Sequence, residues 1–441
     1  MNHKTWNPLR QFFQIDARGS SVRREIVAGI TTFTTMSYII VVNPAILKTA
    51  GIPEGPSMTA TVLTAVCGCL LMGLYANRPF AIAPYMGENA FIAFTICLGL
   101  GIRWQVALGA IFLAGVAFVA LTLLRLRQWL VEAIPRSLRY SFAVGIGLFL
   151  AFIGLTQTGI VELGVPGAPV KAGALTSVPV LVAIFGFLLI GALVIRQVPG
   201  ALLIGIVLTA FVAFVTRVAP WPHKVFGAPA SLAPIFAQMD VRGALQPRAL
   251  PVVLTIFIMA FVDTMGTLIG LSARAGFLDQ QGNLPQIERP MMADAVATTL
   301  APLFGTTTAG AFVESATGIE AGGRTGLTAV VVALLFALSA FTAPFVAAIP
   351  AQAYGPALII VGLFMLAPIA RIDFTDYAES IPAFAVVALM CFTLNIAVGI
   401  TAGFLLYPLC KLVQGKARQI GTGLWILAAL SLLFFVYYPY R

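Results

Sequence analysis

Apolar stretches of about 20 residues recur along the whole chain and are separated by short polar segments. A helix of about 20 residues crosses the ~30 Å hydrocarbon layer of a bilayer, so each stretch can form one crossing. In the first half the stretches lie at 24–46, 57–76, 79–100, 103–124, 136–156, 176–195 and 199–217. In the second half they lie at 249–272, 288–304, 307–321, 324–348, 355–371, 380–396 and 398–413, and a last one covers 422–438. The pattern predicts an all-α polytopic membrane protein with about 14 spans.

Composition agrees with this prediction. Hydrophobic residues make up 60% of the 441 residues, and only 10% are charged. The apolar share of soluble domains is nearer one half, so a soluble globular protein is excluded. All five cysteines lie inside apolar stretches, at spacings that match neither a disulfide framework nor a metal site. We therefore expect no metal and interpret the cysteines as small packing residues.

The formal charge of +10 does not indicate binding to nucleic acid, because the basic residues lie in short segments between spans. Cytoplasmic segments of membrane proteins are enriched in Lys and Arg. This rule predicts a multi-pass protein of the cell (inner) membrane with residues 1–25 in the cytoplasm. It also places the end of 398–413 inside, so 380–413 crosses twice and 422–438 is an extra crossing or a peripheral helix. The basic residues behind this topology are Arg10, Arg18, Arg23, Arg24, Arg125, Arg127, Arg136, Arg139, Lys411, Lys416 and Arg418.

The two halves of the chain repeat each other weakly. Residues 131–135 read VEAIP and residues 346–350 read VAAIP, and the triplet GLF follows in register at 147–149 and 362–364. With seven spans in each half, the second half would be inverted relative to the first, as in many secondary transporters. A bundle without a repeat is the alternative.

Two spans at corresponding places contain segments that oppose a continuous helix. Residues 79–87 (PFAIAPYMG) hold two prolines, and residues 305–313 (GTTTAGAFV) are rich in Thr and Gly. A carboxylate follows each segment, Glu88 in the first case and Glu314 in the second. Extended backbone at membrane depth is tolerated where it lines a polar site, and a half-helix that begins there can bind a ligand. The alternative is a pair of kinked spans packed against their neighbours.

Five carboxylates lie inside apolar stretches. A charge at bilayer depth costs roughly 2.5–3.5 kcal/mol on insertion scales, so such residues usually mark a substrate or proton pathway. The five are Glu88, Asp263, Asp294, Glu314 and Glu320.

At these residues the chain resembles the nucleobase–cation symporters of the azaguanine-permease-like branch, the bacterial adenine and guanine/hypoxanthine permeases. The resemblance implies 14 spans in two inverted sevens, with spans 3 and 10 interrupted by short strands. It implies a core (substrate-binding) domain at 26–125 and 249–348, and a gate domain at 136–217 and 352–438. The matching segments are 31–44 (TTFTTMSYIIVVNP), 83–91 (APYMGENAF), 263–270 (DTMGTLIG), 314–318 (ESATG) and 321–327 (AGGRTGL).

The chain departs from this family's pattern at three positions. The third-span motif is usually APGMGLNAF, whereas Tyr85 stands here for a glycine and Glu88 for a leucine. Guanine/hypoxanthine permeases typically carry an acid three residues before Asp263, where this chain has Ala260 as the adenine permeases do. This difference favours adenine as substrate.

The resemblance implies that Glu314 is the main ligand of the base edge, since the family's substrate-binding acid matches it. A carboxylate suits the N–H donors of a purine, and such charge-assisted bonds are roughly twice as strong as neutral ones. Asp263 would ligate substrate, carry the proton, or both, and Asp294 would brace the core domain. Asn89 would complete the site. Gly87, Ser315 and Thr264 are further candidate substrate-binding residues.

Three of these residues also have a purely structural interpretation. Glu314 would then only offset the helix dipole, Asp263 would be tied to a threonine such as Thr264, and Asn89 would cap the half-helix.

The coupling ion is expected to be the proton. Both histidines, His3 and His223, lie in polar segments, so the membrane carrier would be a carboxylate: Asp263, Glu314 or Glu88. A carboxylic acid removed from water ionises less readily and can bind and release a proton near neutral pH. Sodium coupling stays open, because carboxylates and threonine hydroxyls also ligate sodium.

We therefore expect a proton symporter that imports purine nucleobases, adenine first, by an elevator-like alternating-access mechanism. Its partners would be the nucleobase and the lipid bilayer, without a cofactor, and a homodimer is compatible with this reading. The alternatives are transport of an anion, xanthine or uracil on the same fold. A membrane enzyme would need a metal cluster or a nucleophile–base set, and the sequence suggests neither, so no catalytic residue is expected.

Overall fold

The computed structural model describes residues 8–124, 134–165, 168–279, 284–393 and 395–437. Arg125, Arg127 and 131–133, which entered the topology and repeat arguments, lie outside these residues. The helices up to residue 244 are α1 (Pro8–Phe12), α2 (Val22–Met36), α3 (Ile39–Thr49), α4 (Glu54–Leu70), η1 (Leu71–Tyr75), α5 (Met86–Ala90), η2 (Phe91–Gly99), α6 (Trp104–Leu123), α8 (Arg136–Gln157), α9 (Val178–Ile195), α10 (Ala201–Val215) and α11 (Val241–Ala244).

The later helices begin at Leu250. They are α12 (Leu250–Ala275), α13 (Glu288–Phe304), α14 (Ser315–Glu320), α15 (Gly326–Ser339), η3 (Ala340–Thr342), α16 (Ala343–Val346), α17 (Ala351–Phe364), η4 (Ala367–Arg371), α18 (Tyr377–Phe392), α19 (Ile396–Val413), η5 (Ala417–Gln419) and α20 (Thr422–Tyr437). The strands are β1 (Ile82–Pro84), β2 (Val161–Val165), β3 (Ala168–Ala172) and β4 (Ala309–Ala311).

Nine helical segments of the described residues are long and apolar enough to cross a membrane, and four further apolar helices are shorter. The prediction of a mostly helical, multi-pass membrane protein is therefore confirmed. Segment 380–413 forms two helices, α18 and α19, which pack against each other. Helix boundaries follow local chemistry: α12 has a proline in its first turn, and its last residue, Ala275, is followed by Gly276, whose φ of 69° is left-handed.

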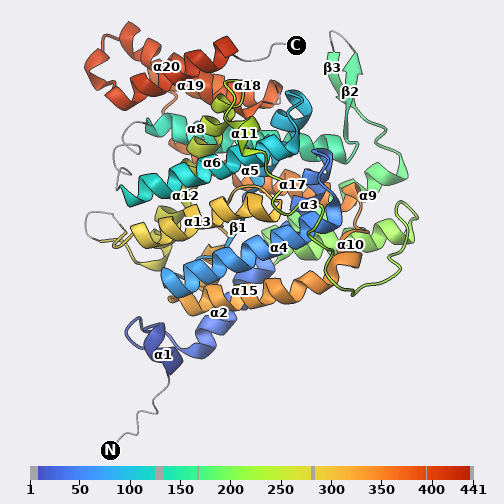
Figure 1. Ribbon diagram of the computed structural model, residues 1–441. Helices are drawn as coiled ribbons and strands as arrows, with labels where there is room; N and C mark the ends of the chain where they lie inside the picture. Colours follow the sequence, from blue (N-terminus) through green and yellow to red (C-terminus); the bar gives the residue numbers. More distant parts are fainter. Residues whose placement is uncertain (1–7, 125–133, 166–167, 280–283, 394, 438–441) are drawn as a thin grey trace, which may run out of the picture.

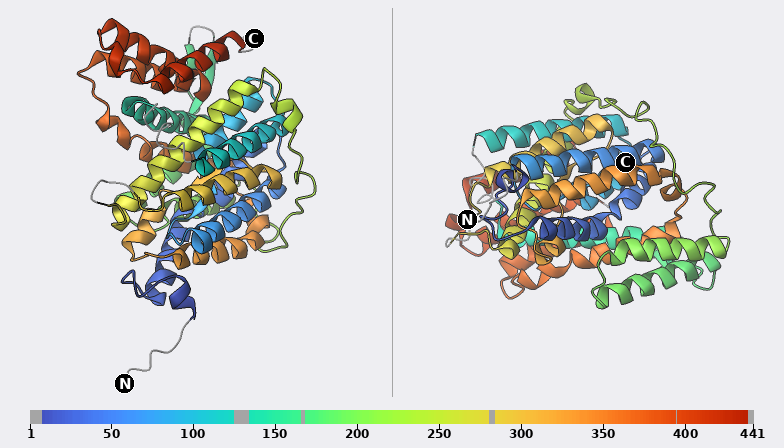
Figure 2. Two further views of the ribbon diagram at one scale, coloured as in Figure 1. Left: turned by 60° about the vertical axis from the view of Figure 1, so that its left-hand side comes forward. Right: turned by 90° about the horizontal axis from the view of Figure 1, so that it is seen from below.

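The helices form two groups that pack mainly within themselves. In the first group α6 packs against α12 and α13, and α15 packs against α2 and α4. In the second group α17 packs against α8, α9 and α10, while α18 contacts α8 and α19. Helices α18 to α20 lie at the opposite end of the molecule from α1 and α2 (Figures 1 and 2). Contacts between the groups include those of α5 with α8 and of α3 with α17.

Helices α8 and α17 approach each other closely because glycines face each other at two levels. A Cβ atom on Gly362 would lie 2.4 Å from the carbonyl oxygen of Gly147. A Cβ atom on Gly154 would lie 2.7 Å from the carbonyl oxygen of Gly355. Both contacts are too short for any side chain, so this crossing depends on glycine. The first pair consists of the two glycines that begin the repeated GLF triplets.

Two local features were not predicted from the sequence. The first span is divided into α2 and α3 by a turn at Ser37 and Tyr38. An antiparallel hairpin also joins α8 to α9, with β2 paired to β3 in the register Val161↔Ala172. The hairpin projects from one end of the helices (Figure 1).

Candidate functional site

The two interrupted spans meet at their interruptions. Strands β1 and β4 pair antiparallel with Ala83 opposite Gly310, and all six of their residues are buried. Each strand is followed by a short helix, α5 after β1 and α14 after β4. The candidate residues that follow the strands, Glu88 and Glu314, are therefore brought to one region of the molecule.

Side chains from neighbouring elements hold this strand pair in place. The hydroxyl of Ser315 accepts a hydrogen bond of 2.9 Å from the amide of Ala81. The thiol of Cys69 on α4 accepts one of 3.2 Å from the amide of Ile82. Ser315 was a candidate substrate ligand, and in this structure its hydroxyl is hydrogen-bonded to the residue immediately before β1.

Three consecutive threonines before β4 each bond to a polar side chain from the first half. Thr306 accepts a hydrogen bond of 3.0 Å from the amide nitrogen of Asn43, Thr307 donates to Asn89, and Thr308 donates to Glu88. All of these side chains are buried. Asn89 Nδ2 and Glu88 Oε1 have no hydrogen-bond partner among the described residues. The threonine run thus fixes one polar atom of Glu88 and one of Asn89, and the other polar atom of each side chain has no partner among the described residues.

Glu314 lies immediately before α14 and is partly exposed. Its Oε1 accepts a hydrogen bond of 2.8 Å from the hydroxyl of Tyr38, at the turn between α2 and α3. Helix α14 is held along α2 by a hydrogen bond of 3.0 Å between Thr317 and Thr35. Gly318 lies so close to α2 that a Cβ atom there would be 2.0 Å from the Thr32 hydroxyl. The position of Glu314 is therefore set by the first span.

Asp294 accepts two hydrogen bonds that connect three elements. One is from the amide of Ala311 on β4, at 2.7 Å, and the other is from the hydroxyl of Thr264 on α12. The hydroxyl oxygen of Thr264 in turn lies 3.2 Å from the hydroxyl oxygen of Tyr85. Since Thr264 donates its only hydroxyl proton to Asp294, Tyr85 donates to Thr264. These bonds tie α13 to α12 and β4, and the bracing role of Asp294 stays a prediction.

Asp263 has a different environment from Asp294. It is partly exposed, and its carboxylate makes no hydrogen bond to any residue that the structure describes. It lies within electrostatic range of Glu88 and Asp294. Asp263 is therefore available to a ligand or a proton.

Gly87 packs against the second group of helices. A Cβ atom on this residue would lie 2.5 Å from Cγ2 of Ile146 on α8. This contact explains why position 87 is a glycine, because α5 and α8 pack too closely there for a side chain. It gives no direct evidence for substrate binding.

Glu320 does not share the environment of the other four acids, which corrects the expectation that it lies within the membrane pathway. Its side chain is 63% exposed and forms an ion pair of 2.7 Å with Arg274. Both residues lie near helix ends, Glu320 at the end of α14 and Arg274 in the last turn of α12. Hydropathy averages over the whole stretch 307–321, so it does not separate an acid at the end of that stretch from one in its middle.

The sequence prediction missed two aromatic residues of the site, Phe312 and Tyr38. The rings of Tyr85 and Phe312 are nearly parallel, at an angle of 6°, with centroids 6.4 Å apart. The Tyr85 ring also covers Gly310, where a Cβ atom would lie 2.0 Å from the Tyr85 hydroxyl oxygen. Tyr38 was the other residue missed, although it lies within the first matching segment. Contacts of this kind join residues distant in sequence, so no local pattern indicates them.

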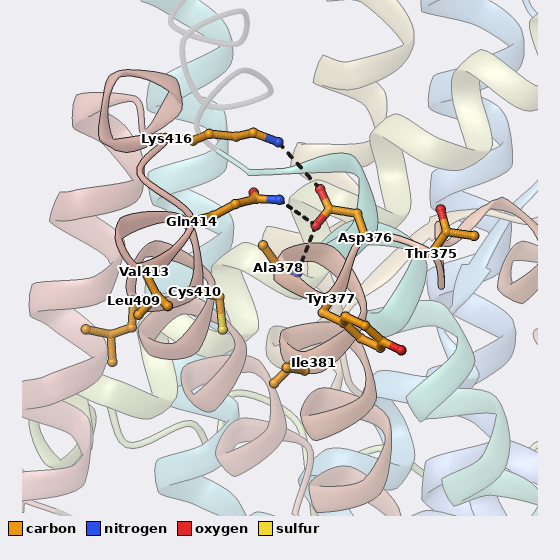
Figure 3. A pocket seen from close by; sticks show the side chains of 10 residues that line it. All are labelled: Thr375, Asp376, Tyr377, Ala378, Ile381, Leu409, Cys410, Val413, Gln414 and Lys416. Atoms are coloured by element: carbon orange, nitrogen blue, oxygen red, sulfur yellow. Dashed lines mark hydrogen bonds and ion pairs between the residues drawn. The ribbon is translucent and has the colours of Figure 1, made fainter.

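A surface hollow lies between α18 and α19 (Figure 3), and no residue of β1 or β4 lines it. Asp376 at its rim accepts hydrogen bonds from the amide of Ala378, at 2.9 Å, and from Gln414, at 3.0 Å. The bond from the Ala378 amide lowers the pKa of the Asp376 carboxyl, and nearby Lys411 acts in the same direction. This polar rim is satisfied within the protein. The acids and aromatic rings beside β1 and β4 therefore define the candidate site.

No cluster of His, Cys, Asp or Glu that could hold a metal ion occurs within the residues described by the structure.

Comparison with known proteins identifies the family. Residues 23–402 match the Permease family Xan_ur_permease. The guanine/hypoxanthine permease PbuO of Bacillus subtilis is 41% identical, over 96% of this chain and 99% of its own length. The adenine permease AdeP of Escherichia coli is 37% identical, over 97% of this chain and 96% of its own length.

A solved structure shows the same fold at low identity. It is the transmembrane domain of a cyanobacterial bicarbonate transporter, BicA, with a TM-score of 0.63 and 17% identity, covering 86% of this chain and 97% of that one. The sequence relatives are permeases, so this chain is a membrane transporter rather than an enzyme. The chain belongs to the permease family that includes these bacterial nucleobase permeases.

Proposed function

We propose that the protein imports purine nucleobases by proton symport. The observation that carries this proposal is the position of Glu314, a partly exposed carboxylate beside the β1–β4 pair and oriented by Tyr38. A purine presents N–H donors along one edge, and a carboxylate is a strong acceptor for them. The names of the relatives AdeP and PbuO, an adenine and a guanine/hypoxanthine permease, support the same class of substrate.

The aromatic pair supports a flat ligand. Aromatic rings stack on nucleobases because every base has a π face, and a stacked base gains about 1–3 kcal/mol. Tyr85 and Phe312 lie beside the strands that precede Glu88 and Glu314. A base that stacks on one of these rings would present its edge to Glu314, with Asn89 Nδ2 as a donor for a ring nitrogen.

Adenine is the substrate that we propose to be preferred. Ala260 is buried on α12, three residues before Asp263. Residues three apart share one face of a helix, so an acid at this position would extend the set of acceptors beside Asp263. Without that acid the site has fewer partners for the ring N–H groups of an oxopurine, and adenine has fewer such groups.

Asp263 is the proposed proton carrier of the cycle. It is partly exposed and has no hydrogen-bond donor among the described residues, so a proton from water can neutralise it. Glu314 receives a hydrogen bond from Tyr38 and is better suited to bind the base as a carboxylate. Proton binding at Asp263 would remove a negative charge from the core domain before that domain moves within the membrane.

An elevator-like movement of a core domain (26–125 and 249–348) against a gate domain (136–217 and 352–438) is proposed as the transport step. The two packing groups support this division. Two inverted seven-span repeats, giving 14 spans, are supported by the antiparallel β1–β4 pair and by the contact of Gly147 with Gly362. We also propose an inner-membrane location with residues 1–25 in the cytoplasm, and a homodimer is compatible with the fold.

Uptake of radiolabelled bases into cells that lack their own permeases tests this proposal. Adenine, hypoxanthine, guanine, xanthine and uracil would be compared in the presence of a proton gradient, a sodium gradient, or an uncoupler. We expect adenine accumulation that the uncoupler abolishes, and Asp263→Asn should retain only exchange of labelled for unlabelled base. Accumulation driven by sodium alone would refute proton coupling, and the absence of uptake of every purine would refute the substrate class.

A further inference from the structure

Glu88 is a buried acid whose surroundings favour a bound proton. Its side chain is 1% exposed. Oε2 accepts a hydrogen bond from Thr308, and Oε1 has no hydrogen-bond partner among the described residues. An ionised carboxylate there would have one buried, charged oxygen without a donor, which is unfavourable. A proton on Oε1 removes the charge.

The neighbours of Glu88 act in the same direction. The charged groups that act on it are Asp263 of α12 and Asp294 of α13, and Tyr85 is the further titratable group beside them. Basic residues on elements that contact α5 are Lys48 of α3, Arg274 of α12, and Arg136 and Arg139 of α8. Lys48 pairs with Glu54 at 2.7 Å, and Arg274 pairs with Glu320. The two arginines of α8 lie about two helical turns or more before Ile146, the α8 residue that contacts Gly87. The acids of the cluster therefore repel one another when they are ionised.

Asp294 is the acid of this cluster that has the most hydrogen-bond donors. The amide of Ala311 and the hydroxyl of Thr264 both donate to it, and Tyr85 donates to Thr264. Every donor in this series of hydrogen bonds directs its hydrogen towards Asp294, and such an arrangement favours a negative charge on Asp294. Asp263 and Glu88 have no equivalent set of donors among the described residues.

We propose that Glu88 and Asp263 each carry one proton, so that two protons enter with each nucleobase. This inference rests on the proposed proton symport and specifies its stoichiometry. Both protons come from water outside the cell, bind to carboxylate oxygens while the base is bound, and leave to cytoplasmic water after its release. Asp263 is partly exposed and exchanges with water directly, whereas Glu88 is enclosed and exchanges through the region of Asp263.

Purified protein in proteoliposomes tests the stoichiometry. The membrane potential is clamped at zero, and the ratio of internal to external adenine is measured at the point where net flux stops. For each unit of pH difference across the membrane, this ratio is about tenfold if one proton is coupled and about hundredfold if two are. We expect about hundredfold for the wild type and about tenfold for Glu88→Leu. Glu88→Gln keeps the size of the side chain and its bond to Thr308, so it gives the same test if the leucine variant does not fold.

Glu320→Gln is the matched control, because Glu320 is an exposed acid paired with Arg274 outside the cluster. It should keep the hundredfold ratio. A wild-type ratio of tenfold would overturn the two-proton inference and leave proton symport intact. A hundredfold ratio in Glu88→Gln would overturn the role of Glu88. No response of the wild type to pH, with accumulation driven by sodium, would instead refute the proposed coupling itself.

Discussion

The hydroxyl of Tyr38 donates a hydrogen bond of 2.8 Å to Oε1 of Glu314, although the two residues are 276 positions apart in the sequence. Tyr38 lies at the turn that divides the first span, and Glu314 lies just before the half-helix α14. Helix α14 has only six residues, so it cannot fix the direction of its preceding side chain by itself. The first span therefore orients the acid that we propose to bind the base.

Removal of the Tyr38 hydroxyl should weaken transport without removing the acid. Hydrogen bonds to charged groups contribute about 1.5–3 kcal/mol, so Tyr38→Phe should raise the KM for adenine by about tenfold or more. Tyr75→Phe is the matched control, because Tyr75 is an exposed residue of η1. Initial rates of adenine uptake at equal protein levels measure the effect. Equal KM values in Tyr38→Phe and the wild type would show that the bond does not position Glu314.

The contact between Gly310 and Tyr85 predicts a mutation with a specific compensation. A methyl group at Gly310 would lie 2.0 Å from the Tyr85 hydroxyl oxygen, so Gly310→Ala must displace the Tyr85 ring. We expect Gly310→Ala to lose most adenine uptake. The double variant that adds Tyr85→Gly removes the clash and should recover part of the uptake relative to Gly310→Ala alone. If the double variant is no better than the single one, the ring contact is not the cause of the loss.

Substitution of Ala260 tests the origin of the preference for adenine. Ala260→Asp adds a carboxylate one helical turn from Asp263, on the same face of α12. Competition against labelled adenine should then shift towards guanine or hypoxanthine, because an oxopurine gains an acceptor for its ring N–H. Guanine that already competes better than adenine in the wild type would contradict the argument from Ala260 and leave nucleobase transport in place.

The helices were predictable because the bilayer imposes length and hydropathy on each crossing. The interruptions were predictable as well, since the prolines of 79–87 and the Thr and Gly residues of 305–313 oppose helix locally. The partners of the threonine run were not predictable. Thr307 and Thr308 bond to residues 218 and 220 positions away, and such pairs arise only from the tertiary fold.

Glu320 shows the opposite kind of limit. A hydropathy window averages over a stretch, so it cannot distinguish an acid in the middle of a span from one at the end of a short helix. The ion pair with Arg274 joins residues 46 positions apart. Tyr38 and Phe312 were missed for a related reason: an aromatic residue in an apolar stretch has the same pattern whether it faces lipid, the core or a ligand.

The central claim is that Glu314 binds the base, and the most direct test is the affinity of purified protein for adenine. Loss of a charge-assisted bond should cost about 1.5–3 kcal/mol, so Glu314→Gln should raise the Kd for adenine more than tenfold. Glu320→Gln, which removes an exposed acid at the other end of the same helix, should bind adenine as the wild type does. A folded Glu314→Gln protein with the wild-type Kd for adenine would contradict the account.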